Sequence, residues 1–265
     1  MFNLFAKNSI KLYELTTFNP MENNTQIYGI RAVIEAIKAD KPIDKVFIQK
    51  GIKGDLFKEF ETLIRKNGIN ASYVPIEKLN RLTKGNHQGV VANISPIRFF
   101  SLEELVEKVA TKETTPLFLL LDQLSDVRNF GAIIRTAECT GVDGIIIQKK
   151  GAAPVTGDTI KTSAGAAFKV PIAKVDHIKD AVFYLQASGI KIIAATEKTE
   201  SSIYDISFKE PCAIIMGAED VGISPSILKI ADDKAKLPLL GEIGSLNVSV
   251  ACGVFLYEAV RQRTS

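Results

Sequence analysis

From Pro116 onward, short apolar runs alternate with longer segments of helical periodicity. The run LFLLLD at 117–122 opens this pattern and is apolar except for its last residue. Strands that are apolar on both faces are typical of a parallel sheet covered by helices on both sides. We therefore expect an α/β domain whose ligand-binding loops lie at the carboxyl ends of the strands. The expected strands are 117–122, 144–148, 191–196, 212–217 and 235–239, and the expected helices are 129–140, 176–188, 224–230 and 245–263.

A length of 265 residues favours two domains, and a smaller α/β domain is predicted upstream. Within residues 25–98, helices are expected at 27–38, 55–67 and 76–82, and strands at 45–49, 71–75 and 90–94. Residues 99–115 hold one expected helix, 101–110, and a polar tail, and we interpret them as a linker. Residues 1–24 are expected to be a disordered extension, or a segment upstream of a true start at Met21, and 116–265 form the second domain.

The two domains differ in charge. Residues 21–98 carry 13 Lys and Arg against 8 Asp and Glu, whereas residues 99–265 carry 18 against 21. A basic first domain indicates an anionic partner such as a nucleic acid. A surplus of this size also falls within the ordinary variation of soluble domains.

Several function classes are disfavoured by composition and by missing motifs. No apolar run reaches the ~18 residues of a membrane span, so no membrane partner is expected. Cys139, Cys212 and Cys252 lie far apart in apolar contexts, which indicates buried thiols in a reducing compartment, the cytoplasm. Only His87 and His177 are present, which disfavours a His-based metal site or a Ser-His hydrolase. Neither a dinucleotide-binding glycine motif nor a P-loop occurs.

The segment LDQLSDVRNFGAIIR, residues 121–135, joins an apolar strand to an apolar helix. Asn129 lies near the start of this helix and Arg135 lies within it. An arginine there is costly unless it faces a cleft or a partner. The structural alternative is that Asn129 caps the helix and that Arg135 forms an ion pair with Glu138.

A second segment, IIMGAEDVGIS at 214–224, follows a buried strand directly with a glycine-containing loop. Gly217 and Gly222 would let a ligand approach the backbone, and Glu219 would project at the ligand edge of the sheet. The structural alternative is a tight turn with a solvated glutamate, followed by an ordinary helix start at Ser224 and Pro225.

The third segment is LPLLGEIGSLNVSVA, residues 237–251. Ser245, Asn247 and Ser249 are expected in the first turn of the last helix, where backbone N–H groups lack partners. The structural alternative is that Ser245 only caps the helix. Three small polar residues exceed what a cap requires, so a binding role is expected.

Together these segments resemble the SpoU family of RNA ribose 2′-O-methyltransferases, within the SPOUT superfamily. The family's three motifs are matched by Asn129, Gly131 and Arg135, by Gly217, Glu219 and Gly222, and by Pro238 with residues 245–249. The stretches 27–37 and 87–92 are similar to the substrate-binding domain of the bacterial 23S rRNA (guanosine-2′-O-)-methyltransferase branch. One departure is Val127, where the family often has a proline.

The resemblance implies a C-terminal parallel-sheet α/β knot, a deep trefoil, behind a small L30e-like α/β domain. It further implies that S-adenosylmethionine is the cofactor and that no metal is used. The expected cofactor-binding residues are Thr196, Gly217, Leu237 and Leu246. The implied partners are RNA, most plausibly rRNA, and a second copy of the chain bound through the knot.

The resemblance also implies the catalytic residues Asn129, Arg135, Glu219, Ser245 and Asn247. In the family, the arginine is proposed to remove the proton of the ribose hydroxyl, but an arginine with a pKa above ~12 rarely loses its own proton. The alternative is that Arg135 pairs with a phosphate and stabilises the developing alkoxide, while Glu219 or water takes the proton.

Two rival functions remain open at this point. One is a ribose methyltransferase that acts on tRNA, and the other is a catalytically silent RNA-binding protein of the same fold. His87 is interpreted either as an RNA contact or as a surface turn residue, and the Phe99–Phe100 pair as domain packing.

Overall fold

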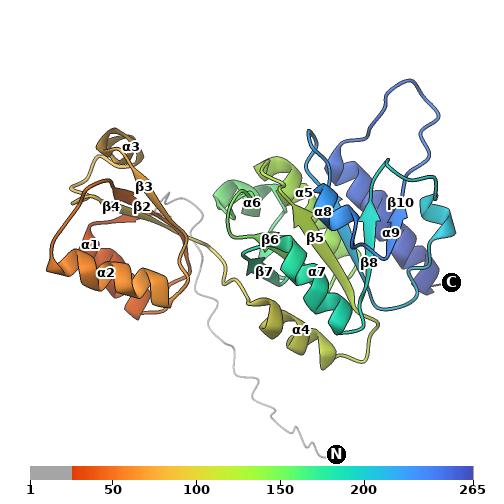
Figure 1. The fold of residues 1–265 in the computed structure, drawn as a ribbon, viewed down its shortest axis with the longest axis horizontal. Coiled ribbons are helices and arrows are strands. Elements are labelled where there is room, and N and C mark those ends of the chain that lie inside the picture. Colours follow the sequence, from red (N-terminus) through yellow and green to blue (C-terminus); the bar gives the residue numbers. More distant parts are fainter. Residues whose placement is uncertain (1–25, 265) are drawn as a thin grey trace, which may run out of the picture.

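The computed structural model describes residues 26–264 as two α/β domains joined in sequence by residues 95–101 (Figure 1). The extension expected at residues 1–24 lies outside the described residues. The N-terminal domain lies beside the edge of the second domain's sheet that β6 (Gly144–Gln148) and β7 (Ile172–Val175) form in Figure 1.

The N-terminal domain is a four-stranded mixed sheet of order β1-β4-β2-β3 with helices on both faces. Val33 of α1 and Phe60 of α2 are buried on one face, and Leu79 of α3 is buried on the other. Gly29, at φ 91°, separates β1 from α1. Residues 27–28 therefore belong to a strand, whereas a helix was expected there. The elements are β1 (Gln26–Tyr28), α1 (Ile30–Lys38), β2 (Ile43–Gln49), α2 (Asp55–Lys66), β3 (Ala71–Val74), α3 (Ile76–Leu82) and β4 (Val90–Ile94).

The segment interpreted as a linker, residues 99–115, packs against the second domain. It contains α4 (Leu102–Ala110), which begins with a reciprocal capping box between Ser101 and Glu104. Leu102, Leu105 and Val109 are buried against the sheet. Phe100 forms a parallel bridge to Ala173, so this segment extends the edge of the sheet, and the expected packing role of the Phe99–Phe100 pair is confirmed.

The second domain contains a six-stranded, entirely parallel sheet of order β10-β8-β9-β5-β6-β7. Alternate residues of β5 face opposite sides: Leu119 packs with α5 and α9, and Leu120 with α4, α7 and α8. The expected α/β class and the covering of both faces are confirmed. The elements are β5 (Leu117–Asp122), α5 (Val127–Cys139), β6 (Gly144–Gln148), α6 (Gly157–Thr162), η1 (Ala166–Phe168), β7 (Ile172–Val175), α7 (Ile178–Ala187), β8 (Lys191–Ala195), η2 (Ile203–Asp205), β9 (Cys212–Gly217), α8 (Pro225–Leu228), β10 (Asp233–Ala235) and α9 (Val248–Thr264).

The structure corrects several expectations for this domain. It adds β7 and α6, it ends the last strand at Ala235 instead of residue 239, and it begins α9 at Val248 instead of Ser245. Cys139 is exposed, whereas Cys212 and Cys252 are buried as expected. Among the described residues, no helix combines the length and apolarity that crossing a bilayer requires.

Candidate functional site

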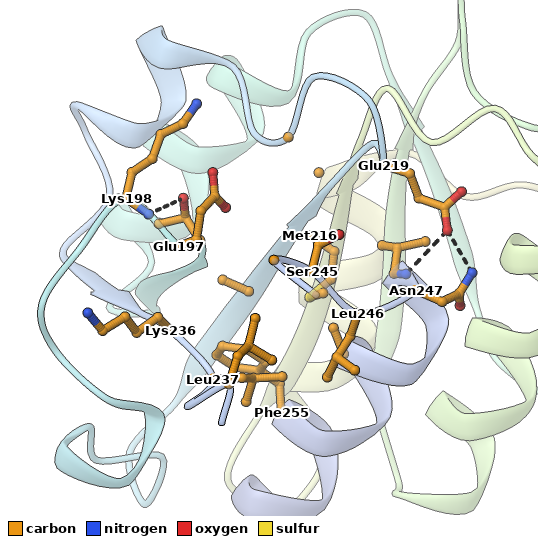
Figure 2. A pocket seen from close by; sticks show the side chains of 18 of the residues that line it. Glu197, Lys198, Met216, Glu219, Lys236, Leu237, Ser245, Leu246, Asn247 and Phe255 are labelled. Atoms are coloured by element: carbon orange, nitrogen blue, oxygen red, sulfur yellow. Dashed lines mark hydrogen bonds between the residues drawn. The ribbon is translucent and has the colours of Figure 1, made fainter. Parts of the chain in front are cut away.

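The second and third sequence motifs meet at the carboxyl ends of β8, β9 and β10, around a cavity of about 920 Å³ (Figure 2). The loops after these strands, together with the first turns of α9, form its walls. Seven of the predicted site residues line it: Thr196, Gly217, Glu219, Leu237, Ser245, Leu246 and Asn247. Asn129 and Arg135 are outside the lining.

Gly217 is required by the fold of its own loop. The chain turns back after β9, so that Ala218 and Gly222 form an antiparallel bridge, and the N–H of Gly222 donates to the Ala218 carbonyl at 2.8 Å. A Cβ atom on Gly217 would lie 2.1 Å from the carbonyl carbon of Gly222 and 2.3 Å from the nitrogen of Ile223. Gly222 itself has φ +68°, which favours glycine. Both glycines therefore shape the cavity wall.

Asn247 joins the three motifs. Its amide Nδ2 donates to Asn129 Oδ1 at 3.0 Å. It also donates to Glu219 Oε1 at 2.6 Å (Figure 2). Its Oδ1 accepts from the N–H of Ser249 at 3.0 Å, the bond that an N-cap residue makes, and also from the Ser249 hydroxyl. Asn247 thus caps α9. Hydrogen bonds at both Nδ2 and Oδ1 fix the orientation of its amide group. Ser245, the expected cap, lies in the preceding loop and is exposed.

Asn129 is not needed as a helix cap. Asp126 is the N-cap of α5, and its carboxylate accepts from the N–H of Asn129 at 2.7 Å. The side chain of Asn129 is therefore available to Asn247. Asp126 was missed by sequence reasoning, although an aspartate three residues before Asn129 is an ordinary cap signal.

Gly131, the glycine of the first motif, serves helix packing. A Cβ atom on Gly131 would lie 2.6 Å from the Cβ of Thr162, because α6 crosses α5 closely at this point. The contact fixes the position of α5 and therefore of Asn129.

Arg135 is exposed on α5, less than two turns beyond Asn129. Within residues 26–264 it makes no hydrogen bond or salt bridge. The expected alternative, a pair with Glu138, is wrong, because Glu138 binds Lys169 with an Nζ–Oε1 distance of 3.0 Å. The guanidinium is therefore available to a partner outside the described chain.

Asp122 was also missed, and it fastens the second motif to β5. It is 1% exposed, and its Oδ2 accepts from the N–H of Ser224 at 2.8 Å. The Ser224 hydroxyl accepts from the amide of Gln123 at 2.8 Å. The signal in the sequence was a carboxylate at the end of an apolar strand.

His87 has a structural role in the N-terminal domain. It is only 9% exposed, which corrects its interpretation as a surface turn residue. Its Nδ1 accepts from the N–H of Gly89 at 3.0 Å, and its Nε2 lies 2.9 Å from Asn80 Oδ1. These contacts hold the turn before β4. Across the described part of the chain, no cluster of three or more His, Cys, Asp and Glu side chains is arranged to hold a metal.

Comparison with known proteins gives one consistent family. The model described as "SpoU rRNA Methylase family" matches residues 116–257, and "RNA 2'-O ribose methyltransferase substrate binding" matches residues 26–100. The putative TrmH family tRNA/rRNA methyltransferase YacO of Bacillus subtilis is 33% identical and covers 91% of this chain and 97% of its own length. A putative TrmH family tRNA/rRNA methyltransferase of Staphylococcus aureus is 35% identical, with the same two coverages of 91% and 97%.

Solved structures share the fold. The SpoU methyltransferase AviRb from Streptomyces viridochromogenes, in complex with the cofactor AdoMet, superposes with a TM-score of 0.57 at 24% identity, covering 91% of this chain and 90% of that one. The A. aeolicus TrmH/SpoU tRNA modifying enzyme is 32% identical, with a TM-score of 0.53 over 62% of this chain and 82% of its own. With both domains matched and the three motifs joined through Asn247, the chain belongs to the SpoU (TrmH-like) family of RNA methyltransferases.

Proposed function

We propose that the protein transfers a methyl group from S-adenosylmethionine to the 2′-oxygen of a ribose in RNA, and that its target is a guanosine of 23S rRNA. The observation that carries this proposal is the contact of Asn247 with both Asn129 and Glu219 beside a cavity of cofactor size. The cytoplasm, where the RNA and the cofactor are found, is the proposed place of action.

The cavity fits S-adenosylmethionine. Its volume of about 920 Å³ is ample for a nucleoside cofactor. Leu237, Leu246 and Phe255 provide apolar surface for an adenine ring, and the loop at Gly217 offers backbone groups close to the ligand. When bound, this cofactor supplies a methyl group on a positively charged sulfur, which departs as a neutral thioether.

The chain itself must align the ribose hydroxyl with that methyl group and manage its proton. Asn247 holds Glu219 Oε1, which leaves Oε2 to accept a hydrogen bond from the hydroxyl. Arg135 has no partner in the described chain and can pair with a phosphate of the substrate. Under this proposal Glu219 or water takes the proton, and Arg135 stabilises the developing negative charge.

A homodimer through α9 is part of the proposal. Residues 248–257 of α9 carry no charge, and Val250, Val254 and Tyr257 are 53%, 38% and 56% exposed. Exposed large apolar side chains at this density mark interaction sites. Sedimentation velocity should give a dimer for the wild-type protein and a monomer for Tyr257→Glu. A monomeric wild-type protein would contradict this part of the proposal.

Two experiments test the activity. Calorimetry should show binding of S-adenosylmethionine, and an absence of binding would leave the silent RNA-binding alternative. Incubation of transcribed 23S rRNA with S-adenosylmethionine, followed by ribose-methylation mapping, should reveal one new 2′-O-methylguanosine. Methylation of transcribed tRNA, with 23S rRNA unchanged, would instead support the tRNA alternative.

A further inference from the structure

A second cavity, of about 410 Å³, lies at the seam between the two domains. We refer to it as the seam groove. Its walls come from α2 and β3 of the N-terminal domain, and from the end of β6 and the β7–α7 turn of the second domain. Arg65, Lys150 and Tyr73 are its exposed cationic and aromatic lining residues. The groove therefore combines positive charges from both domains with an aromatic ring of the N-terminal domain.

The charge of the seam groove is not fully compensated. It is lined by Arg65, Lys149 and Lys150 against Glu61 and Asp176. Lys149 pairs with Asp176 at 3.0 Å, and Arg65 lies 3.6 Å from Glu61, but Asp176 is 71% and Arg65 79% exposed. Such surface pairs contribute only about 0–1 kcal/mol and can exchange for a phosphate. Lys150 has no carboxylate partner within the described residues.

Tyr73 offers an aromatic surface whose position is fixed. Its hydroxyl donates to Glu61 Oε1 at 2.6 Å, while the residue stays 47% exposed. This hydrogen bond to a carboxylate raises the pKa of Tyr73 above its ordinary value of 10. Exposed aromatic rings stack on nucleic-acid bases and contribute about 1–3 kcal/mol per base.

One loop connects the seam groove to the catalytic motif. Residues 149–156 join β6 to α6, and the Lys149 carbonyl accepts from Asn70 of the N-terminal domain at 2.9 Å. Further along, the N–H of Ala153 donates to the Leu124 carbonyl at 2.8 Å. Leu124 lies in the turn that leads to Asp126 and α5. The loop that lines the seam groove thus also contacts the turn that leads to Asn129.

We propose that the seam groove binds the backbone of the RNA substrate, between the nucleotide that is methylated and the part of the RNA held by the N-terminal domain. Arg65 and Lys150 contact phosphates, and Tyr73 stacks on a base. The inference rests on the proposed function and adds to it a defined RNA contact that spans both domains.

The salt dependence of binding separates phosphate contacts from base stacking. The probe is transcribed 23S rRNA, and filter binding over a salt series gives the slope of log K against log salt. The double variant R65A/K150A should reduce the magnitude of this slope by about 1.4–1.8, or 0.7–0.9 for each of the two phosphate contacts. Tyr73→Ala should weaken binding about tenfold without changing the slope. Tyr73→Phe keeps the ring but loses its bond to Glu61, and it should retain most of the affinity.

Lys209→Ala is the matched control. Lys209 is exposed and lies three residues before β9, at the amino-terminal edge of the sheet. Its removal should leave the slope unchanged, and every variant should bind S-adenosylmethionine with wild-type affinity, which verifies folding. A wild-type slope in R65A/K150A would overturn only the proposal that the seam groove binds RNA. If the wild-type protein does not bind the rRNA, both this proposal and the proposed function are overturned.

Discussion

Among the predicted site residues, Arg135 is the one for which contacts within the described chain give no structural role. An exposed arginine that has no partner in residues 26–264 fits a contact with substrate better than a structural role. Arg135→Ala should lower the rate of the methyl-transfer step by roughly 100-fold, the usual effect of removing one group that stabilises developing charge. Arg135→Lys should retain part of the rate, because it keeps the charge but loses the two-pronged geometry.

Single-turnover methylation of 23S rRNA measures this effect, with calorimetry of S-adenosylmethionine binding to verify the site. Lys179→Ala on α7 serves as a control, since α7 covers the opposite face of the sheet and Lys179 is exposed. Near-wild-type rates for both Arg135 variants would exclude a catalytic role for this residue.

The cysteines differ in their reactivity for physical reasons. Complete burial raises the pKa of Cys252 to about 12, and burial also raises the pKa of Cys212, while Cys139 is exposed. A thiol reagent at pH 8 should therefore label one cysteine of the folded protein, and Cys139→Ser should abolish that labelling. All three should react in denaturant. Fast labelling of two or more thiols in the native protein would contradict the burial of Cys252 and Cys212.

Cys252 also gives a direction for stability at high pH. Its folded pKa of about 12 exceeds the ordinary value of 9. Between these two pKa values the folded state therefore binds more protons than the unfolded chain. The free energy of unfolding therefore falls as the pH rises through this range. Well below pH 9 the thiol is neutral in both states and contributes no pH dependence.

At the scale of elements, the loop after β9 depends on Gly217. Gly217→Ala would place a methyl group against backbone atoms of Gly222 and Ile223, which cannot rotate away. We expect the affinity for S-adenosylmethionine to fall at least tenfold and the free energy of unfolding to drop by about 1–3 kcal/mol. Gly241→Ala, where a Cβ atom meets nothing within 4 Å, should change neither quantity. Calorimetry and urea unfolding measure both effects, and equal behaviour of the two variants would contradict the role of Gly217.

The elements that the sequence predicted best are those with uniform burial. β5 and β9 are apolar runs, and both occur at their expected residues. The sequence does not predict β7, because its four residues include the charged Lys174. The partner of Lys174, Asp44, lies 130 positions away in the chain. The start of α9 was misplaced because Ser245 resembles a cap. The true cap, Asn247, is distinguished by bonds to Glu219 and Asn129, which no local pattern reveals.

At the scale of the whole molecule, a buried ion pair connects the domains. Lys174 of β7 and Asp44 of β2 pair with side chains only 15% and 12% exposed, and the Lys174 ammonium lies 3.7 Å from the centre of the Phe99 ring. Burial lowers the pKa of Lys174, and the Asp44 carboxylate opposes that shift. Without Asp44, the lysine charge would be buried with no counter-ion, at a cost of about 3 kcal/mol at neutral pH.

Asp44→Asn should therefore weaken the contact between the domains. Calorimetry at pH 7 should show the N-terminal domain unfolding at a lower temperature than in the wild type. The folded state lowers the Lys174 pKa, so the unfolded chain binds more protons between that pKa and 10.5. The stability that Asp44→Asn removes should therefore become smaller as the pH rises toward 10. The double variant Asp44→Asn with Lys174→Met removes the unpaired charge and should recover most of the stability. If the double variant is as unstable as Asp44→Asn, the pair does not hold the domains together through its charges.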